Sequence, residues 1–241
     1  MTETAVKVLG DFFENDFWFS EVLYGGVYRT DLVAVDVDFQ AVEERVNATG
    51  CTEPLTSKWR RLITYEGLRS KEPASIDEMV ESRNYPYASS YCRTIYNWLR
   101  KNGYLRKNED GLFEPVPFPD VINQVIAFEL KQKDWEKALK QASRANYADS
   151  RYVVMDADHV EKPADNLDKF REEGVGLISL ERENMKVILE AGDFETGYLK
   201  CHKARWKLRE DSFDKSVQEK DIEPSKPQNS ISDFVERGGA E

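Results

Sequence analysis

The tetrapeptide Phe128-Glu129-Leu130-Lys131 places two charged side chains in an otherwise apolar segment. If this segment is a strand, period-two alternation puts Glu129 and Lys131 on one face and the two apolar residues on the other. A carboxylate binds hard cations such as Mg²⁺, and a lysine two residues away can hold an attacking water or a phosphate oxygen. The spacing therefore favours metal-assisted hydrolysis of a phosphodiester.

A second acid, Asp31, lies in another apolar run, directly before Leu-Val-Ala-Val. One carboxylate alone holds Mg²⁺ poorly, so the site needs a further donor. Burying an unpaired charge is costly, and Asp31 and Glu129 both present that problem, which a single shared site explains. Glu-x-Lys in a strand is also common as a cross-strand ion pair, and this alternative stays open.

The segments around these acids predict the elements that position them. Apolar residues at helical spacing predict a helix over 3–14. Segments 17–24 and 27–37 are rich in aromatic and β-branched residues and flank Gly25-Gly26, which predicts a hairpin with Asp31 in its second strand. Further elements are expected as strands at 120–131, 151–157, 176–181 and 185–192, and helices at 134–148, 166–174 and 195–218. This order predicts a mixed α/β unit.

Residues 37–118 differ in pattern from the segments on either side. A linker over 46–56 leads to three amphipathic helical stretches, with Ser75 and Ser89 at N-cap positions. Gly103 ends the third stretch, and Asp110-Gly111 predicts a tight turn between two short strands. The pattern indicates a folded module inserted into the α/β unit.

The order helix, hairpin, Asp31 in the second strand, and Glu-x-Lys in the next strand resembles the PD-(D/E)XK nuclease superfamily, whose fold is restriction-endonuclease-like. The resemblance covers residues 1–36 and 119–190. It implies that Asp31 and Glu129 ligate Mg²⁺ or Mn²⁺ and that Lys131 orients the water. The resemblance also extends to two further side chains, Gln141 from the helix after the Glu-x-Lys strand and Glu14 as a first-helix acid.

Two departures from the family pattern bear on this assignment. The 97 residues between Asp31 and Glu129 exceed the usual separation, so the resemblance requires that they contain a folded insert. Tyr147 does not stand at the Gln-x-x-x-Tyr spacing of RecB-type members.

The insert resembles winged helix-turn-helix domains over about residues 56–117. In such domains the third helix lies in the major groove and the wing reaches adjacent phosphates or the minor groove. The residues that this resemblance places at duplex DNA are Ser89, Ser90, Tyr91, Arg93, Thr94 and Asn97 from the helix, and Arg106 and Lys107 from the wing. Arg93 and Asn97 are the side chains suited to base edges. Winged helices also bind proteins, and Glu109 and Asp110 repel phosphate, so a protein-interaction module is the alternative.

Charge is distributed unevenly along the chain. The net charge of −11 argues against non-specific binding of the whole chain along nucleic acid. Residues 56–117 hold 11 Lys and Arg against 8 Asp and Glu, so this segment carries +3 and the remainder −14. The insert is thus the part where contact with DNA is expected.

Cysteine and histidine usage excludes other classes of site. Cys51, Cys92 and Cys201 are far apart with no Cys-x-x-Cys spacing, so neither a disulfide framework nor a zinc site is indicated. The only histidines are His159 and His202, which disfavours nucleophilic triads. No apolar run is long enough to span a membrane, and the acidic N-terminus lacks secretory features, so a cytoplasmic location is expected.

These patterns predict three parts of the chain. A discontinuous nuclease-like domain is expected from residues 1–36 and 119–218, with a linker and winged helix inserted over 37–118. Residues 219–241 are Pro-, Ser- and charge-rich and predict a disordered tail. Its short apolar segment 231–238 is either without function or a peptide that orders on a protein partner.

The expected function is Mg²⁺-dependent hydrolysis of double-stranded DNA, with a homodimer if both strands are cut. The alternative is a non-catalytic DNA-binding regulator that uses the nuclease-like core for dimerisation or partner docking.

Overall fold

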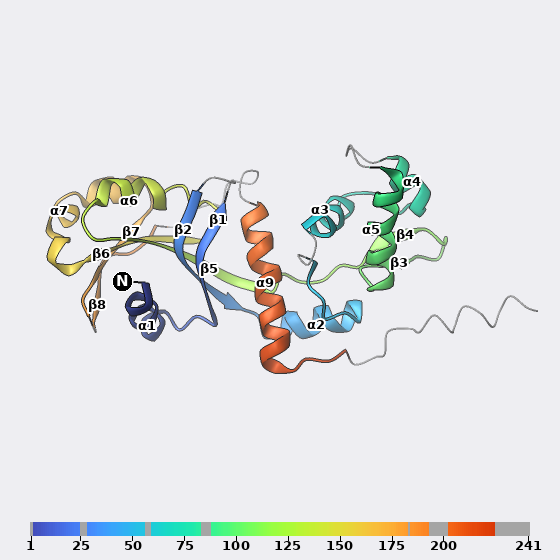
Figure 1. Cartoon of the computed structure of the whole chain (residues 1–241), viewed down its shortest axis with the longest axis horizontal. Helices are drawn as coiled ribbons and strands as arrows, with labels where there is room; N and C mark the ends of the chain where they lie inside the picture. Colours follow the sequence, from blue (N-terminus) through green and yellow to red (C-terminus); the bar gives the residue numbers. More distant parts are fainter. Residues whose placement is uncertain are drawn as a thin grey trace, which may run out of the picture. The chain divides into compact units, whose positions relative to one another are not determined.

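Two folding units are built from interleaved parts of the chain in the computed structural model (Figure 1). The first comprises residues 1–38 and 122–212, and the second comprises 39–121 and 213–241. The structure describes residues 2–24, 28–55, 59–82, 88–182, 184–192 and 202–224. The predicted Gly25-Gly26 turn and tail segment 231–238 lie outside these ranges.

A six-stranded mixed sheet forms the centre of the first unit. Its strands are β1 (Phe17–Tyr24), β2 (Tyr28–Val37), β5 (Ile122–Lys131), β6 (Ser150–Asp156), β7 (Gly176–Leu180) and β8 (Met185–Leu189), in the order β1-β2-β5-β6-β7-β8. The pairs β5–β6 and β6–β7 are parallel, and the other neighbouring pairs are antiparallel. The expected α/β class with a mixed sheet is confirmed.

Helices cover both faces of this sheet, as Figure 1 shows for α1 and α6. The helices of this unit are α1 (Thr2–Phe13), α6 (Trp135–Ala142), the 3₁₀ turn η2 (Ala157–His159), α7 (Glu161–Ala164), α8 (Leu167–Glu172) and the first part of α9 (His202–Lys220). Phe128, Leu130 and Val154 pack with α1 on one face. Val153 and Met155 pack with α6 and α8 on the other. Because the central strands are covered on both faces, their sequences are nearly continuous apolar runs.

Helix α6 ends at Ala142, before the end of the predicted 134–148, and the carbonyl of its C-cap residue is bonded from the sheet. The buried Arg151 of β6 donates to the carbonyl of Ser143 at the end of α6, at 2.8 Å, and to that of Glu173 at the end of α8, at 2.8 Å. A guanidinium is a favourable partner for the negative end of a helix dipole. Arg151 thus fixes where both helices end against the sheet.

The second unit consists of helices and a small hairpin. Its elements are α2 (Phe39–Thr49), α3 (Trp59–Leu68), α4 (Ile76–Glu81), α5 (Ser89–Lys101), β3 (Leu105–Lys107), β4 (Phe113–Pro115) and the end of α9. β3 and β4 pair antiparallel, and Gly111 in the turn between them has a φ of +78°. Ala74 forms an isolated antiparallel bridge with Phe113. The predicted hairpin is confirmed.

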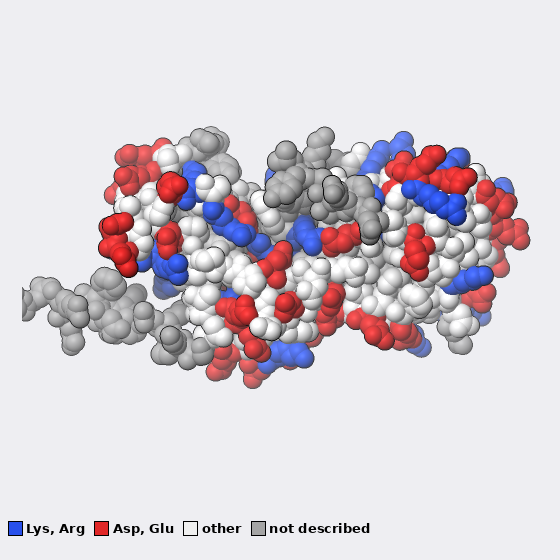
Figure 2. Space-filling view, turned by 180° about the vertical axis from the view of Figure 1, so that it is seen from behind, with Lys and Arg blue, Asp and Glu red and all other residues white. Residues whose placement is uncertain are grey.

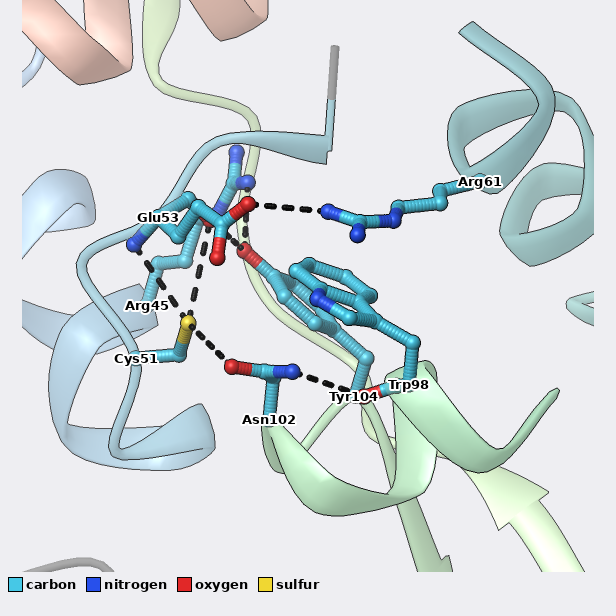
Figure 3. Close-up of polar contacts among 7 residues, drawn as sticks. All are labelled: Arg45, Cys51, Glu53, Arg61, Trp98, Asn102 and Tyr104. Atoms are coloured by element: carbon cyan, nitrogen blue, oxygen red, sulfur yellow. Dashed lines mark hydrogen bonds and ion pairs between the residues drawn. The ribbon is translucent and has the colours of Figure 1, made fainter. Parts of the chain in front are cut away.

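The linker predicted over 46–56 begins later than expected, because its first residues continue α2, and its described remainder, 50–55, enters the core of the second unit. Val46 belongs to α2, and Leu55 is fully buried. Just before this stretch, the buried Arg45 guanidinium donates to the Tyr104 hydroxyl at 3.0 Å (Figure 3). The same guanidinium lies 3.8 Å from the ring centroid of Phe213. These partners are distant in sequence, so the polar local pattern gave no sign of them.

Glu53 ties this segment to α3 and to the chain that follows α5 (Figure 3). The Tyr104 hydroxyl donates to the Glu53 carbonyl at 2.9 Å, and Arg61 Nη1 lies 2.8 Å from Glu53 Oε1. The same guanidinium lies 3.5 Å from the ring centroid of Trp98, at the end of α5. Stacking and ion pairing together hold Arg61 in one orientation.

The cysteines that the structure describes are buried thiols. Cys51 and Cys92 are both buried and free. The Glu53 amide donates to Cys51 Sγ at 3.4 Å, and burial raises the pKa of the Cys51 thiol. A raised pKa keeps the thiol protonated and poorly reactive, which fits a structural role. Cys201 lies outside the described residues.

One of the two predicted N-caps is confirmed. Ser75 caps α4 through a capping box in which its side chain accepts from the Glu78 amide while the Glu78 carboxylate accepts from the Ser75 amide. At α5 the N-cap is Ala88, which makes no side-chain cap bond, and Ser89 is the first helical residue. The prediction for Ser89 is therefore wrong by one position.

Removing the capping box should weaken the second unit. Ser75→Ala leaves the Glu78 amide without its side-chain acceptor, and such losses cost about 1 kcal/mol of unfolding free energy. Urea unfolding followed by circular dichroism measures this change. Ser90→Ala, at an exposed position of α5, is the control and should change stability by less than about 0.5 kcal/mol. Equal losses in both variants would contradict the capping role.

Within the described residues, no helix has the length and apolar character needed to cross a bilayer.

Candidate functional site

Strands β2 and β5 bring the predicted catalytic residues together. The two strands are antiparallel neighbours, with Leu32 opposite Phe128 and Val37 opposite Ile122. The chain therefore leaves the sheet at the end of β2 and re-enters it at the adjacent strand. The 97 residues between Asp31 and Glu129 are accommodated without separating the two strands.

Asp31, Glu129 and Lys131 form one connected polar cluster. The Lys131 ammonium lies 2.7 Å from Glu129 Oε1 and 3.3 Å from Asp31 Oδ2. The Leu130 amide donates to the same Asp31 oxygen at 2.9 Å. The lysine thus bridges two carboxylates that come from different strands.

An irregularity in the β1–β2 hairpin accompanies the position of Asp31. The register pairs Ser20 with Leu32 and Val22 with Thr30, but records no pair for the residues between them. Glu21, on the opposite strand at this level, has a φ of +51°, which is uncommon for a residue with a side chain. The regular ladder is interrupted where the Asp31 carboxylate bonds to the backbone of β5.

Glu129 is the buried member of the cluster. Its side chain is 2% exposed, and it pairs in register with Val153, on the face that α6 covers. Burial raises the pKa of Glu129 to about 7, although the hydrogen bond from Lys131 lowers it. Burial also lowers the pKa of Lys131, but the hydrogen bond and charge of Glu129, with those of Asp31, outweigh it and raise the pKa overall. The cluster thus combines a carboxylate that titrates near neutral pH with a charged lysine.

The donor set of this cluster fits Mg²⁺ or Mn²⁺ better than zinc. Asp31 and Glu129 supply two carboxylates, and no group of three or more His, Cys, Asp and Glu side chains occurs in the described part of the chain. Zinc sites need three or four protein ligands, usually His or Cys. Mg²⁺ is commonly held by one or two carboxylates, with water and substrate phosphates as its other ligands.

The two weaker predictions from the family resemblance concern Gln141, whose role stays a prediction, and Glu14. Gln141 lies half-buried near the end of α6, the helix that packs against β5 and β6. Glu14 is exposed just after α1, which covers the opposite face of the sheet, and it does not join Asp31 and Glu129 in a cluster. The structure therefore gives no support for Glu14 as part of this site.

Sequence reasoning missed a contact that supports β2 beside Asp31. The buried Tyr147 hydroxyl donates to Thr30 Oγ1 at 2.8 Å, and Thr30 is itself buried. The spacing between Gln141 and Tyr147 had set this tyrosine apart from the family pattern. The proximity of Tyr147 to the residue before Asp31 depends on the tertiary fold, so no local signal indicated it.

The predicted DNA-contacting residues lie on one helix and one hairpin of the second unit. Those on α5 are all exposed except the half-buried Tyr91: Ser89, Ser90, Arg93, Thr94 and Asn97. The two hairpin cations are partly engaged, since Arg106 pairs with Glu114 at 2.9 Å and the Lys107 ammonium lies 5.5 Å from the ring centroid of Phe113. Figure 2 shows acidic and basic side chains interspersed over the face in view. The described residues on this face form no broad basic surface, so the exposed side of α5 is the better candidate for a nucleic-acid contact.

No family model, curated protein or solved structure matches the chain. Its function has to be inferred from the geometry of its side chains.

Proposed function

We propose that this chain is a Mg²⁺-dependent DNA endonuclease with a PD-(D/E)XK-type site, and that its second unit contains a winged helix-turn-helix that binds duplex DNA. The observation that carries the proposal is the convergence of Asp31, Glu129 and Lys131 from adjacent strands. The two acids have 97 residues between them in the sequence. A chance surface ion pair would not require a buried glutamate, which is costly to keep charged.

The residues of the cluster have separate roles in hydrolysis. Asp31 and Glu129 would hold the ion, and a bound Mg²⁺ lowers the pKa of water and neutralises charge on a phosphoryl oxygen. Lys131 remains a cation beside both acids, so its ammonium is placed to orient the attacking water and to stabilise negative charge that develops on phosphate. The Leu130 amide fixes one oxygen of Asp31.

The order of elements in the second unit supports the DNA-binding half of the proposal. Helix α3, the bridge at Ala74, helices α4 and α5, and the β3–β4 hairpin follow one another as in a winged helix-turn-helix. In that motif the N-terminal residues of the second helix of the turn contact base edges. Helix α5 holds that position here, and its 13 residues include three cations and no acid.

A non-catalytic DNA-binding regulator is the second candidate, and one observation favours it. Lys131 forms ion pairs with both acids, and the described residues contain no third carboxylate in the cluster. A core of this kind can persist as a platform for dimerisation or partner docking. The two candidates differ in a single property, which is cleavage.

Supercoiled plasmid incubated with the full chain tests cleavage directly. We expect nicked circles with Mg²⁺ or Mn²⁺ and no cleavage in excess EDTA, because two carboxylates without a metal do not activate water. Each site cuts one strand, so linear plasmid should appear after nicked circles unless the protein acts as a dimer. Intact plasmid in the presence of either metal, together with retained DNA binding, would favour the regulator.

A further inference from the structure

The outward face of α5 is polar and free of acids. The exposed residues of the helix recur on one side, and they are Ser89, Ser90, Arg93, Thr94, Asn97, Arg100 and Lys101. In a chain of net charge −11, a 13-residue helix with three cations and no acid is complementary to a polyanion. Small hydroxyl residues in the first turn allow close approach to a groove.

Arg93 differs from the other two cations on this face. Arg100 and Lys101 lie in the last turn of α5, whereas Arg93 lies in the N-terminal half, which reaches base edges in helix-turn-helix proteins. Its Nη2 bonds to Asp77 Oδ1 from the first turn of α4. Both side chains remain substantially exposed, at 49% for Arg93 and 70% for Asp77. An exposed pair of this kind contributes little to stability.

The first turn of α4, which carries Asp77, is held by a capping box. Ser75 and Glu78 form the capping box of α4, so Glu78 is engaged and Asp77 is the acid of the first turn that faces Arg93. Only one of the five N–H groups of the guanidinium is needed for the bond to Asp77 Oδ1, and the others remain available. The pair thus restricts the orientation of the Arg93 guanidinium and leaves two N–H donors on one side of it for another acceptor.

We propose that Asp77 is a positioning residue that directs Arg93 to a guanine in the major groove of duplex DNA. The inference rests on the DNA binding proposed for α5 and adds its sequence preference. Guanine presents two acceptors, O6 and N7, which match two donors of one guanidinium. The Asp77 carboxylate repels phosphate and so disfavours an alternative contact of Arg93 with the DNA backbone. It can also accept from the amino group of a neighbouring cytosine.

The hairpin supplies a matched control pair. Arg106 bonds to Glu114 at 2.9 Å, also between an exposed arginine and an acid on a neighbouring element. This pair lies on β3 and β4 rather than on α5. Glu114→Gln therefore removes the same kind of interaction without touching the arginine that we assign to base recognition.

Selection from a randomised duplex library tests the proposal with the full chain in EDTA, where cleavage is not expected. Wild-type protein should enrich guanine at one position by about 10-fold or more, the discrimination expected of a bidentate contact. Asp77→Asn and Arg93→Ala should both reduce this enrichment to less than about 3-fold. Glu114→Gln should retain it.

Affinity for a mixed-sequence duplex separates positioning from structural damage. Asp77→Asn should bind such a duplex as tightly as wild type or tighter, because it loses a group that repels phosphate. A folded Asp77→Asn protein that keeps the guanine preference, or wild-type protein without any preference, would overturn this inference and leave DNA binding intact. Folded wild-type protein that binds no duplex at low salt would instead overturn the DNA-binding function itself.

Discussion

Replacing Lys131 with methionine should lower the rate of DNA cleavage by on the order of 1,000-fold, equivalent to about 4 kcal/mol of transition-state stabilisation. The ammonium lies within 3.3 Å of both proposed metal ligands, so it acts where negative charge develops on phosphate. The variant should retain metal binding, because both carboxylates remain and the cation that lies between them is gone. A loss of rate without a loss of metal binding is the expected result.

Two measurements on the same preparations separate these roles. Single-turnover plasmid nicking gives the rate, and calorimetric titration with Mn²⁺ gives the affinity for the ion. Asp31→Asn and Glu129→Gln should lose both cleavage and metal binding, since each removes a proposed ligand. If Lys131→Met cleaves at the wild-type rate, the lysine has only the structural role of holding the two acids together.

Glu129→Gln should stabilise the metal-free protein at about pH 8 while it removes cleavage. Burial raises the pKa of Glu129 from 4.5 to about 7 in the folded chain, so between these values the folded state binds more protons than the unfolded state. Wild-type stability therefore falls as the pH rises through this window, by about 3 kcal/mol in total. Glutamine carries no proton to lose, so the variant escapes this loss.

Urea unfolding in EDTA at a series of pH values from about 4.5 to 8 measures the difference. The stability curves of wild type and Glu129→Gln should lie closest near the acid end and diverge as the pH rises. Glu172→Gln, at an exposed position of α8, is the matched control for the loss of one negative charge. Parallel curves for wild type and Glu129→Gln would contradict the cost of burying this carboxylate.

The site was more predictable from sequence than the core of the second unit, and the reason is physical. Asp31 and Glu129 each stood in an apolar run, where a charge needs a partner, and the structure joins them through Lys131. Arg45 stood in a polar helix, where a charge is ordinary, yet it is buried against Phe213 from the other end of the chain. A local sequence pattern indicates that a charged residue is buried and paired only when the residues around it are apolar.

Glu14 and Ser89 show the limits of transferring a pattern to a position. The end of a helix allows an acid at Glu14, but the face of the sheet that its helix covers is set by tertiary packing. Ser89 has the residue type of an N-cap, yet the chain enters α5 one residue earlier, at Ala88. Residue type and spacing predict which helix or strand a residue belongs to. The exact contact of its side chain depends on backbone geometry that a local sequence pattern does not give.

The pairing of Val37 with Ile122 makes the β2–β5 connection a natural insertion point. These residues end β2 and begin β5, so without residues 39–121 the two strands would be the arms of an ordinary β-hairpin. A module placed at such a turn breaks no ladder hydrogen bond between β2 and β5, and the entropic cost of closing a loop rises only slowly with its length. The same turn is therefore a point where a folded module can be inserted or exchanged while Asp31 and Glu129 keep their places on adjacent strands.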